Sequence, residues 1–390
     1  MKIASRMESL SPSVTMAITA LARELKAQGK DILSFSAGEP DFDTPEVIKE
    51  AAINAIRDGQ TKYTAVEGTI ETKKAIINKL KKDHGIEYQL DEVIVSNGAK
   101  HSLFNLFQCL IEKGDEVIIP APYWVTYPEQ VKFSDGVPVF IDTDDSTNFK
   151  ITAEQLRAAI TDKTKILLLN TPSNPTGGVY TKEELLSLGE VLKGTDIIVL
   201  SDEMYEKIIY DGKEFNAAAS VSEDMFKRTV TINGISKAVA MTGWRYGYIA
   251  TPHKDLVKAM TKLQGQVTSN VNSITLHAAV AALDGSADAD IEIMRKEFEK
   301  RRDVAYEQFN AIKGLSCVKP DGAFYFFVNI KEVDPDSMKF VADLLEQEGV
   351  AVVPGLAFGT EGYFRFSFAT DLASIEEGIR RIKNFVENNY

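Results

Sequence analysis

The chain has 390 residues, of which 44% are hydrophobic and 26% are charged. This composition is ordinary for a globular protein and argues against a disordered, collagen-like or coiled-coil chain. The length predicts about two domains. Forty-four basic and 57 acidic residues give a net charge of −13. That charge argues against a surface that is basic overall, as binding to nucleic acid or anionic lipid requires, although a local basic pocket stays open.

Cysteines and histidines are few. Cys109 and Cys317 are the only cysteines, which is too few for a disulfide framework and typical of a reducing compartment. The four histidines show no metal-ligand spacing, so we expect no bound metal. The first ten residues lack the apolar stretch of a signal peptide, and no apolar run approaches the roughly 18 residues of a membrane helix. We therefore expect a cytoplasmic globular protein.

Helix starts can be predicted at four places along the chain. Ser11 and Pro12 predict a helix that runs to about residue 28, because a capping side chain followed by proline is typical of a helix start. The same pattern recurs over 44–46. Two capping boxes, over 152–155 and 181–184, predict two further starts.

Short apolar runs between these helices predict buried strands, at 93–95, 117–119, 166–169, 197–200 and 229–232. Their continuous apolarity suits strands that are covered on both faces of a mainly parallel sheet.

From about residue 288 the pattern changes to a long charged helix, followed by short strands near 323–328, 352 and 364, a helix over 337–347 and a final helix. We therefore expect an α/β fold. Its large, mainly parallel α/β domain would cover 40–284. A smaller α+β domain would combine 285–390 with the N-terminal segment 1–39.

Polar and glycine residues follow each of the five predicted strands, over 96–100, 120–124, 170–178, 201–205 and 233–237. In open parallel sheets, ligands bind outside the carboxyl ends of the strands. The convergence of five such ends therefore predicts one shared pocket.

Taken singly, these residues also have ordinary structural explanations. Lys237 alone is typical of a surface lysine, and Trp124 alone is typical of a core. Residues 174–177 could form a simple turn. Asp202 is more informative, because a carboxylate that follows a buried strand needs a partner. Ser236 beside Lys237 is also compatible with a serine–lysine hydrolase, but the G-x-S-x-G elbow is absent there.

Longer motifs favour a functional interpretation. The string over 236–248, Ser-Lys-Ala-Val-Ala-Met-Thr-Gly-Trp-Arg-Tyr-Gly-Tyr, combines with Ser-Asp-Glu-Met-Tyr over 201–205 and Asn-Pro-Thr-Gly over 174–177. Together they resemble the signature of class I pyridoxal-phosphate-dependent aminotransferases. The resemblance extends from 37–42 to 364–367 and is greatest to the bacterial aspartate aminotransferases, whose N-terminal segment carries Ser-Pro-Ser-Val-Thr, here 11–15. It implies the fold type I of pyridoxal-phosphate-dependent transferases and pyridoxal 5'-phosphate as cofactor.

The resemblance also implies roles around the cofactor ring. Lys237 takes the position of the Schiff-base lysine, which also moves the proton between substrate and cofactor. Asp202 would pair with the ring nitrogen. Tyr205 and Asn174 would hydrogen-bond the phenolic oxygen, and Trp124 would stack on the ring.

The cofactor phosphate needs several donors. Gly98, Ala99 and Lys100 begin a predicted helix after a strand, so their N–H groups can face an anion. By resemblance, Arg245 adds a guanidinium and Ser236 a hydroxyl. Tyr63 resembles a tyrosine that reaches the neighbouring subunit's phosphate, which implies a homodimer with active sites at the subunit interface.

The resemblance implies a receptor for two carboxylates. Arg365 would bind the substrate α-carboxylate, because arginine binds carboxylates with two parallel hydrogen bonds. Lys100 would bind the distal carboxylate, and the segment of Ser13 and Thr15 would close over it. His101 stands where glutamine is more usual, so the polar network of the pocket can differ. The substrate contacts implied are Gly38, Lys100, Trp124, Asn174, Arg365, Ser13 and Thr15.

The function so implied is ping-pong transamination of L-aspartate with 2-oxoglutarate, giving oxaloacetate and L-glutamate. Two alternatives within the fold are an aminotransferase for aromatic amino acids or prephenate and a carbon–sulfur lyase. Lys100 argues for a dicarboxylic substrate and against a lyase. The third alternative is a non-catalytic, cofactor-sensing module of a transcription factor. We expect no such DNA-binding domain, because the chain starts almost directly at the aminotransferase segment and is acidic.

Overall fold

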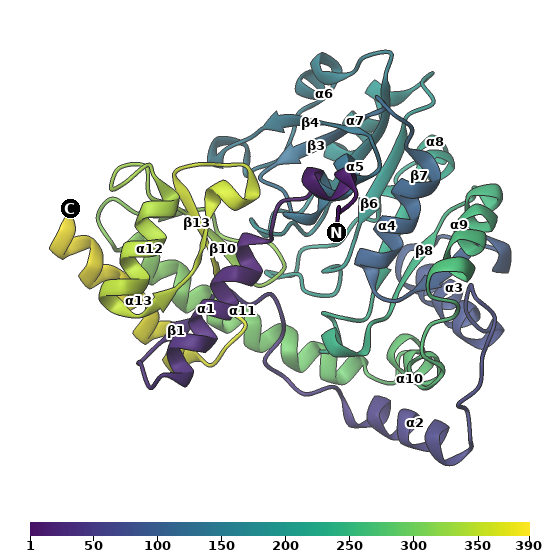
Figure 1. Ribbon diagram of the computed structural model, residues 1–390, viewed down its shortest axis with the longest axis horizontal. Coiled ribbons are helices and arrows are strands. Elements are labelled where there is room, and N and C mark those ends of the chain that lie inside the picture. The colour runs from purple at the N-terminus through teal and green to yellow at the C-terminus, as the bar shows by residue number, and fades with distance from the viewer.

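A computed structural model describes all residues from 1 to 390, which form a large sheet and a small sheet with helices around both (Figure 1). The large sheet has seven strands in the order β2-β8-β7-β6-β5-β3-β4. They are β2 (Val93–Ser96), β3 (Glu116–Ala121), β4 (Val137–Asp142), β5 (Thr164–Asn170), β6 (Ile198–Asp202), β7 (Thr229–Gly234) and β8 (Gly247–Ala250). Only β8 runs against its neighbours, so the other six strands end at the same edge.

All five strands predicted over the large sheet are confirmed, and their continuous apolarity matches burial on both faces. Strands β4 and β8 were not predicted. β4 is a half-exposed edge strand that contains a proline, and β8 is a run of only four residues inside a motif that was interpreted for its chemistry. The helices before, between and after these strands are α2 (Glu46–Arg57), α3 (Ile70–His84), α4 (Ala99–Leu110), α5 (Thr126–Phe133), α6 (Ala153–Ala159), α7 (Lys182–Leu192), α8 (Glu223–Arg228), α9 (Lys254–Val267) and α10 (Ser273–Leu283).

The small sheet is antiparallel, with the order β12-β13-β10-β9. Its strands are β9 (Ser316–Cys317), β10 (Tyr325–Asn329), β12 (Val353–Pro354) and β13 (Tyr363–Ser367). Around it lie α11 (Asp288–Asn310), α12 (Ser337–Glu348), α13 (Leu372–Asn389) and, from the start of the chain, α1 (Val14–Ala27). The pair β1 (Leu33–Ser34) and β11 (Val350–Ala351) also joins the N-terminal segment to this part. We propose that the domain boundary lies near residue 285, between α10 and α11.

Short 3-10 turns complete the fold, at Ser5–Ser9, Leu90–Glu92, Asp145–Thr147, Ala218–Ser220, Thr242–Trp244 and Gly355–Phe358. Both predicted capping boxes form, at the starts of α6 and α7. Two predicted helix starts were wrong in detail. Helix α1 begins at Val14, not at Pro12, because Ser13 Oγ accepts the capping hydrogen bond. Thr44 does not cap α2, since its hydroxyl donates instead to the Ala240 carbonyl at 2.8 Å.

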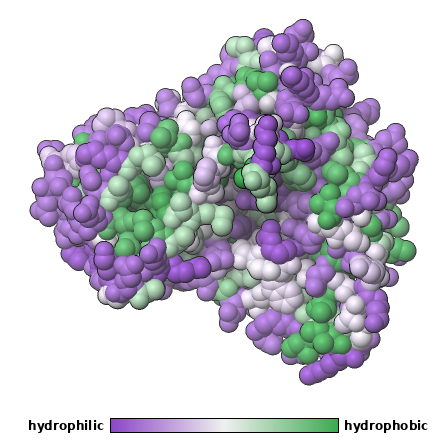
Figure 2. Space-filling model, in the orientation of Figure 1, coloured by the Kyte–Doolittle hydropathy of each residue, from purple (hydrophilic) through white to green (hydrophobic).

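The hydrophobic core continues from one sheet to the other. The largest cluster of buried apolar side chains has 49 members, and it includes Ile119 and Ile232 of the large sheet together with Phe326 and Phe364 of the small one. The residues that lie between the two sheets are therefore supported by one continuous, close-packed core. The outer face drawn in Figure 2 is largely hydrophilic, with separate apolar patches. None of the helices combines the length and the apolarity that crossing a membrane demands.

Candidate active site

A cavity of about 490 Å³ lies at the carboxyl edge of the large sheet and extends to the small sheet. Twelve of the predicted site residues line it: Thr15, Gly38, Ala99, Lys100, Trp124, Asn174, Asp202, Tyr205, Ser236, Lys237, Arg245 and Arg365. Three others do not. Ser13 caps α1, and Gly98 lies against the Arg245 guanidinium. Tyr63 is 90% exposed and is not part of the cavity wall.

Lys237 follows β7 and points into the cavity, where its ammonium donates to the Gly38 carbonyl. Burial lowers the pKa of this amine to about 8; Arg365 and Arg245 lower it further, while Glu39 and Asp202 oppose the shift. The unprotonated fraction of the amine at neutral pH is therefore larger than that of an ordinary lysine. A neutral amine is the form that attacks a carbonyl carbon or takes up a proton.

Asp202 is the last residue of β6 and is 4% exposed. Its Oδ2 accepts a hydrogen bond of 2.7 Å from the Tyr127 hydroxyl, and its Oδ1 accepts one of 3.3 Å from the Met204 N–H. Burial raises the pKa of this carboxyl to about 6, against the effect of these hydrogen bonds. Because no side-chain cation pairs directly with Asp202, a protonated ring nitrogen brought by a ligand would satisfy it.

Arg365 of β13 is a buried cation without an anion; its residue is 2% exposed. One guanidinium nitrogen donates to Asn174 Oδ1 at 2.9 Å and another to the Ser36 carbonyl at 2.7 Å, while Nε has no partner. The rings of Tyr325 and Phe358 lie 4.5 and 5.1 Å from its Cζ. A guanidinium held in this way is a receptor for a carboxylate.

An anion cradle lies where α4 begins. Gly98 precedes the helix with φ +87°, and a Cβ there would collide with the Arg245 guanidinium. A Cβ at Gly247 would likewise collide with the backbone nitrogen of Ala99. Two glycines thus bring Arg245 and the β8 backbone close against the helix start, where free N–H groups and the helix dipole favour a phosphate.

Two aromatic relationships shape the rest of the cavity. The Trp124 ring lies 5.3 Å from Tyr127, edge to face, and Lys100 Nζ lies 4.9 Å from the centre of the Trp124 ring. Burial, with Arg245 nearby, lowers the pKa of Lys100.

His101 does not line the cavity: its Nδ1 accepts from the Asn97 N–H at 3.2 Å. The histidine expected to alter the pocket therefore lies outside its wall.

Six residues that line the cavity were not assigned a role from the sequence: Met16, Tyr127, Asn170, Met204, Thr242 and Tyr325. Tyr127 stands three residues beyond Trp124, across the turn that leads into α5, so its spacing was a usable signal. Tyr325 lies in the strand predicted near 323–328, to which no function was assigned, and nothing in its local sequence marks it.

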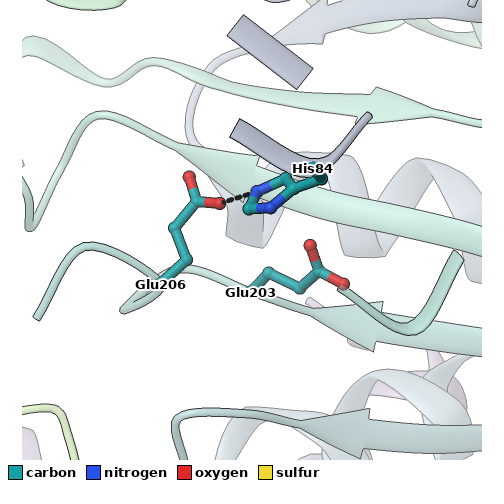
Figure 3. A group of neighbouring side chains, drawn as sticks. All are labelled: His84, Glu203 and Glu206. Carbon is teal, nitrogen blue, oxygen red and sulfur yellow. Dashed lines mark hydrogen bonds and ion pairs between the residues drawn. The ribbon is translucent and has the colours of Figure 1, made fainter. Parts of the chain in front are cut away.

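A second buried polar cluster lies near the site, formed by His84, Glu203 and Glu206 (Figure 3). Glu203 follows Asp202 directly, yet it accepts from Ser201 Oγ at 2.8 Å, away from the cavity. Glu206 accepts from Lys79 and from His84 Nε2, the latter at 2.6 Å. Although the ligand atoms of the three residues lie close enough to share a metal ion, Lys79 already supplies the cation that neutralises Glu206. The cluster is therefore an ion-pair network of the protein itself.

Comparisons with known proteins agree with this geometry. Residues 30–382 match the family described as aminotransferase class I and II. The chain is 50% identical to an aspartate aminotransferase of Bacillus subtilis (strain 168), over all of both chains. It is 48% identical to a probable aspartate/prephenate aminotransferase of Rickettsia felis, over 98% of this chain and 95% of that one. The crystal structure of the aspartate aminotransferase from Rhizobium meliloti superimposes with a TM-score of 0.96 at 44% identity, covering 99% of each chain.

The fold and the site thus define a pyridoxal-phosphate-dependent transferase of fold type I. The chain belongs to the aminotransferase class I and II family. The residues present fit the cofactor of that family. An amine of lowered pKa, a buried carboxylate that lacks a cation and an anion cradle surround one cavity, and they match the aldehyde, the ring nitrogen and the phosphate of pyridoxal phosphate.

Proposed function

We propose that this enzyme transfers the amino group of L-aspartate to 2-oxoglutarate, forming oxaloacetate and L-glutamate by a ping-pong mechanism. The observation that carries the proposal is that two cationic side chains, Arg365 and Lys100, face the cavity in addition to Lys237 and Arg245. Arg365 suits the α-carboxylate that every amino acid has, and Lys100 supplies a second charge for a distal carboxylate. The names of the relatives support the same substrate.

When bound, the cofactor supplies an electron sink for the negative charge that develops at the substrate α-carbon. Asp202 would hold a proton on the ring nitrogen, and Tyr127 orients that carboxylate. Lys237 would hold the cofactor covalently through its Nζ. Its free Nζ would act as the base that takes up and returns the proton at the substrate α-carbon.

Further residues bind and orient. Tyr205 and Asn174 donate to the phenolic oxygen, and Trp124 covers the ring. The start of α4 at Gly98, Ala99 and Lys100, with Arg245 and Ser236, holds the phosphate. Gly38 and Asn174 stand beside Arg365, and the segment of Ser13 and Thr15 closes over the substrate.

We propose a homodimer, in which Tyr63 reaches the phosphate of the neighbouring subunit. Tyr63 supports this, because its aromatic ring is 90% exposed in the single chain and does not line its own cavity. We also propose a cytoplasmic location, which the two unpaired cysteines, Cys109 and Cys317, support. Analytical ultracentrifugation tests the first proposal and fractionation of cells tests the second.

Prephenate is the second candidate amino acceptor, because the Rickettsia relative is named for both substrates. Product analysis separates the candidates. Transamination with 2-oxoglutarate yields oxo acid and glutamate in equal amounts, whereas a lyase would yield ammonia without glutamate. Prephenate used as acceptor in place of 2-oxoglutarate tests the second candidate.

The test of the main proposal is the absorbance spectrum of the purified holoenzyme, recorded before and after L-aspartate is added alone. We expect loss of the lysine-bound cofactor band and growth of the pyridoxamine band. A band that does not respond to L-aspartate would reject this substrate and leave the family intact. The Lys237→Ala variant is the control, and it should bind cofactor without the lysine-bound band.

A further inference from the structure

Tyr325 of β10 contacts three functional residues at once, and its side chain is fully buried. Its hydroxyl lies 2.8 Å from the Tyr205 hydroxyl. Its ring lies 4.5 Å from Arg365 Cζ. The same hydroxyl stands 2.7 Å from the position that a Cβ at Gly38 would take.

The two hydroxyls share a single hydrogen bond, and its direction matters. Burial raises the pKa of both phenols, so each keeps its proton at neutral pH. Each hydroxyl has only one proton to donate. If Tyr205 donates to a ligand in the cavity, it cannot also donate to Tyr325. The shared hydrogen bond must then run from Tyr325 to Tyr205.

We propose that Tyr325 is a positioning residue of the reaction. Its hydroxyl directs the Tyr205 proton toward the phenolic oxygen of the cofactor, and its ring holds the Arg365 guanidinium flat in the carboxylate receptor. The proposal rests on the proposed function for the ligands it names. It connects the cofactor side of the cavity, through Tyr205, to the substrate side, through Arg365.

Gly38 gives a second, steric observation. A methyl group at residue 38 would collide with the Tyr325 hydroxyl alone, because the next nearest atoms, Cζ and Cε1 of the same ring, lie at 3.7 and 3.9 Å. Those two distances are ordinary van der Waals contacts. Gly38 is therefore required because residue 325 carries a hydroxyl. Since the Gly38 carbonyl accepts from Lys237, a displacement of this segment also reaches the reactive amine.

The first experiment compares Tyr325→Phe with Tyr363→Phe in the holoenzyme. Tyr363 is the matched control, because it is also fully buried in the small sheet but its hydroxyl contacts Lys331 instead. The readout is the pH midpoint of the absorption change of the lysine-bound cofactor. Without the Tyr325 donor, Tyr205 stabilises the anionic phenolic oxygen less, so protonation becomes easier. The midpoint should rise by about 0.5–1 pH unit, because the substitution removes one hydrogen bond.

Binding of maleate, a dicarboxylate without an amino group, separates the two roles. The Phe ring still supports Arg365, so Tyr325→Phe should change the maleate Kd by less than about threefold, whereas Tyr325→Leu should raise it about tenfold. An unchanged pH midpoint in Tyr325→Phe would overturn the hydroxyl role. An unchanged maleate Kd in Tyr325→Leu would overturn the ring role.

The second experiment tests the steric link. Gly38→Ala should lower kcat/KM at least tenfold, and addition of Tyr325→Phe should recover a large part of the loss and of the Tm. A double variant no better than Gly38→Ala would contradict the link. If the wild-type holoenzyme fails to respond to L-aspartate, the proposed function fails, while the pH midpoint and the Tm rescue still decide the role of Tyr325.

Discussion

The hydroxyl of Tyr127 donates a hydrogen bond of 2.7 Å to Asp202 Oδ2, and both side chains are buried. The bond joins the first turn of α5 to the end of β6, so it holds the carboxylate at the edge where the cavity opens. It opposes the effect of burial, which raises the pKa of Asp202.

Tyr127→Phe should therefore lower kcat/KM about 10- to 100-fold, the range for loss of one hydrogen bond to a charged group. Tyr88→Phe is the matched control, because Tyr88 is buried and its hydroxyl has no partner. Steady-state kinetics of both variants give the comparison. Equal effects would show that the loss at Tyr127 is not specific to Asp202.

Asp202 should make the stability of the cofactor-free protein depend on pH. Burial raises the pKa of this carboxyl from 3.8 to about 6, so the folded chain binds its proton more tightly than the unfolded chain does. The contribution to the free energy of unfolding therefore falls as the pH rises from about 4 to about 6, and it stays low above that range. The full change is about 3 kcal/mol. Denaturant titrations of the cofactor-free protein and of Asp202→Asn at pH 4.5 and 7 measure about 2 kcal/mol of this change; parallel pH profiles would contradict the assignment.

Lys237 should make cofactor uptake depend on pH. Burial lowers the pKa of its amine to about 8, and the neutral amine is the nucleophile. The rate at which cofactor-free protein forms the lysine-bound band should rise about tenfold per pH unit below 8 and level off above it. Stopped-flow absorbance measures the rate. A plateau that begins only near pH 10 would mean that the amine is not perturbed.

Lys100→Ala should raise the KM for L-aspartate far more than the KM for an apolar amino donor. Loss of one charge-assisted contact corresponds to about 10- to 100-fold. Lys132→Ala is the control, since Lys132 lies on the surface and pairs with Glu129. Because we propose that the start of α4 also holds the phosphate, cofactor affinity is measured in parallel. Equal increases in KM for both amino donors, at unchanged cofactor affinity, would show that Lys100 does not select the substrate.

Glu206→Gln should destabilise the fold strongly. Although burial opposes it, Lys79 and His84 lower the pKa of Glu206 well below its ordinary value. The contribution of Glu206 to the free energy of unfolding is therefore present above about pH 4.5 and is lost as the pH falls. Loss of one partner of a buried ion pair costs about 3–5 kcal/mol.

Denaturant unfolding at pH 7 measures the change. Glu377→Gln is the control, because Glu377 pairs with Arg380 and Arg381 on the surface and should change stability far less. Similar losses of stability for both variants would show that burial does not account for the contribution of Glu206 to the free energy of unfolding.

The sequence by itself determined the features that depend on neighbouring residues. Continuous apolar runs predicted β2, β3, β5, β6 and β7, because strands covered on both faces exclude polar side chains. The capping boxes of α6 and α7 formed as predicted, since both partners lie within one turn. The motifs around Lys237 and Asp202 indicated the chemistry for the same reason: each is a short string whose spacing can be seen directly.

Only the tertiary structure decided which distant residues meet. It placed β8 between β2 and β7, turned Tyr127 onto Asp202, and put Tyr325 between Tyr205 and Arg365. The two tyrosines that share a hydrogen bond are 120 residues apart, and Arg365 meets the Ser36 carbonyl across 329 residues. Such contacts arise from the packing of two sheets on one core, and no local pattern records them. The residue types of the site were therefore present in the sequence, whereas their mutual orientation and their perturbed pKa values came from burial in the folded chain.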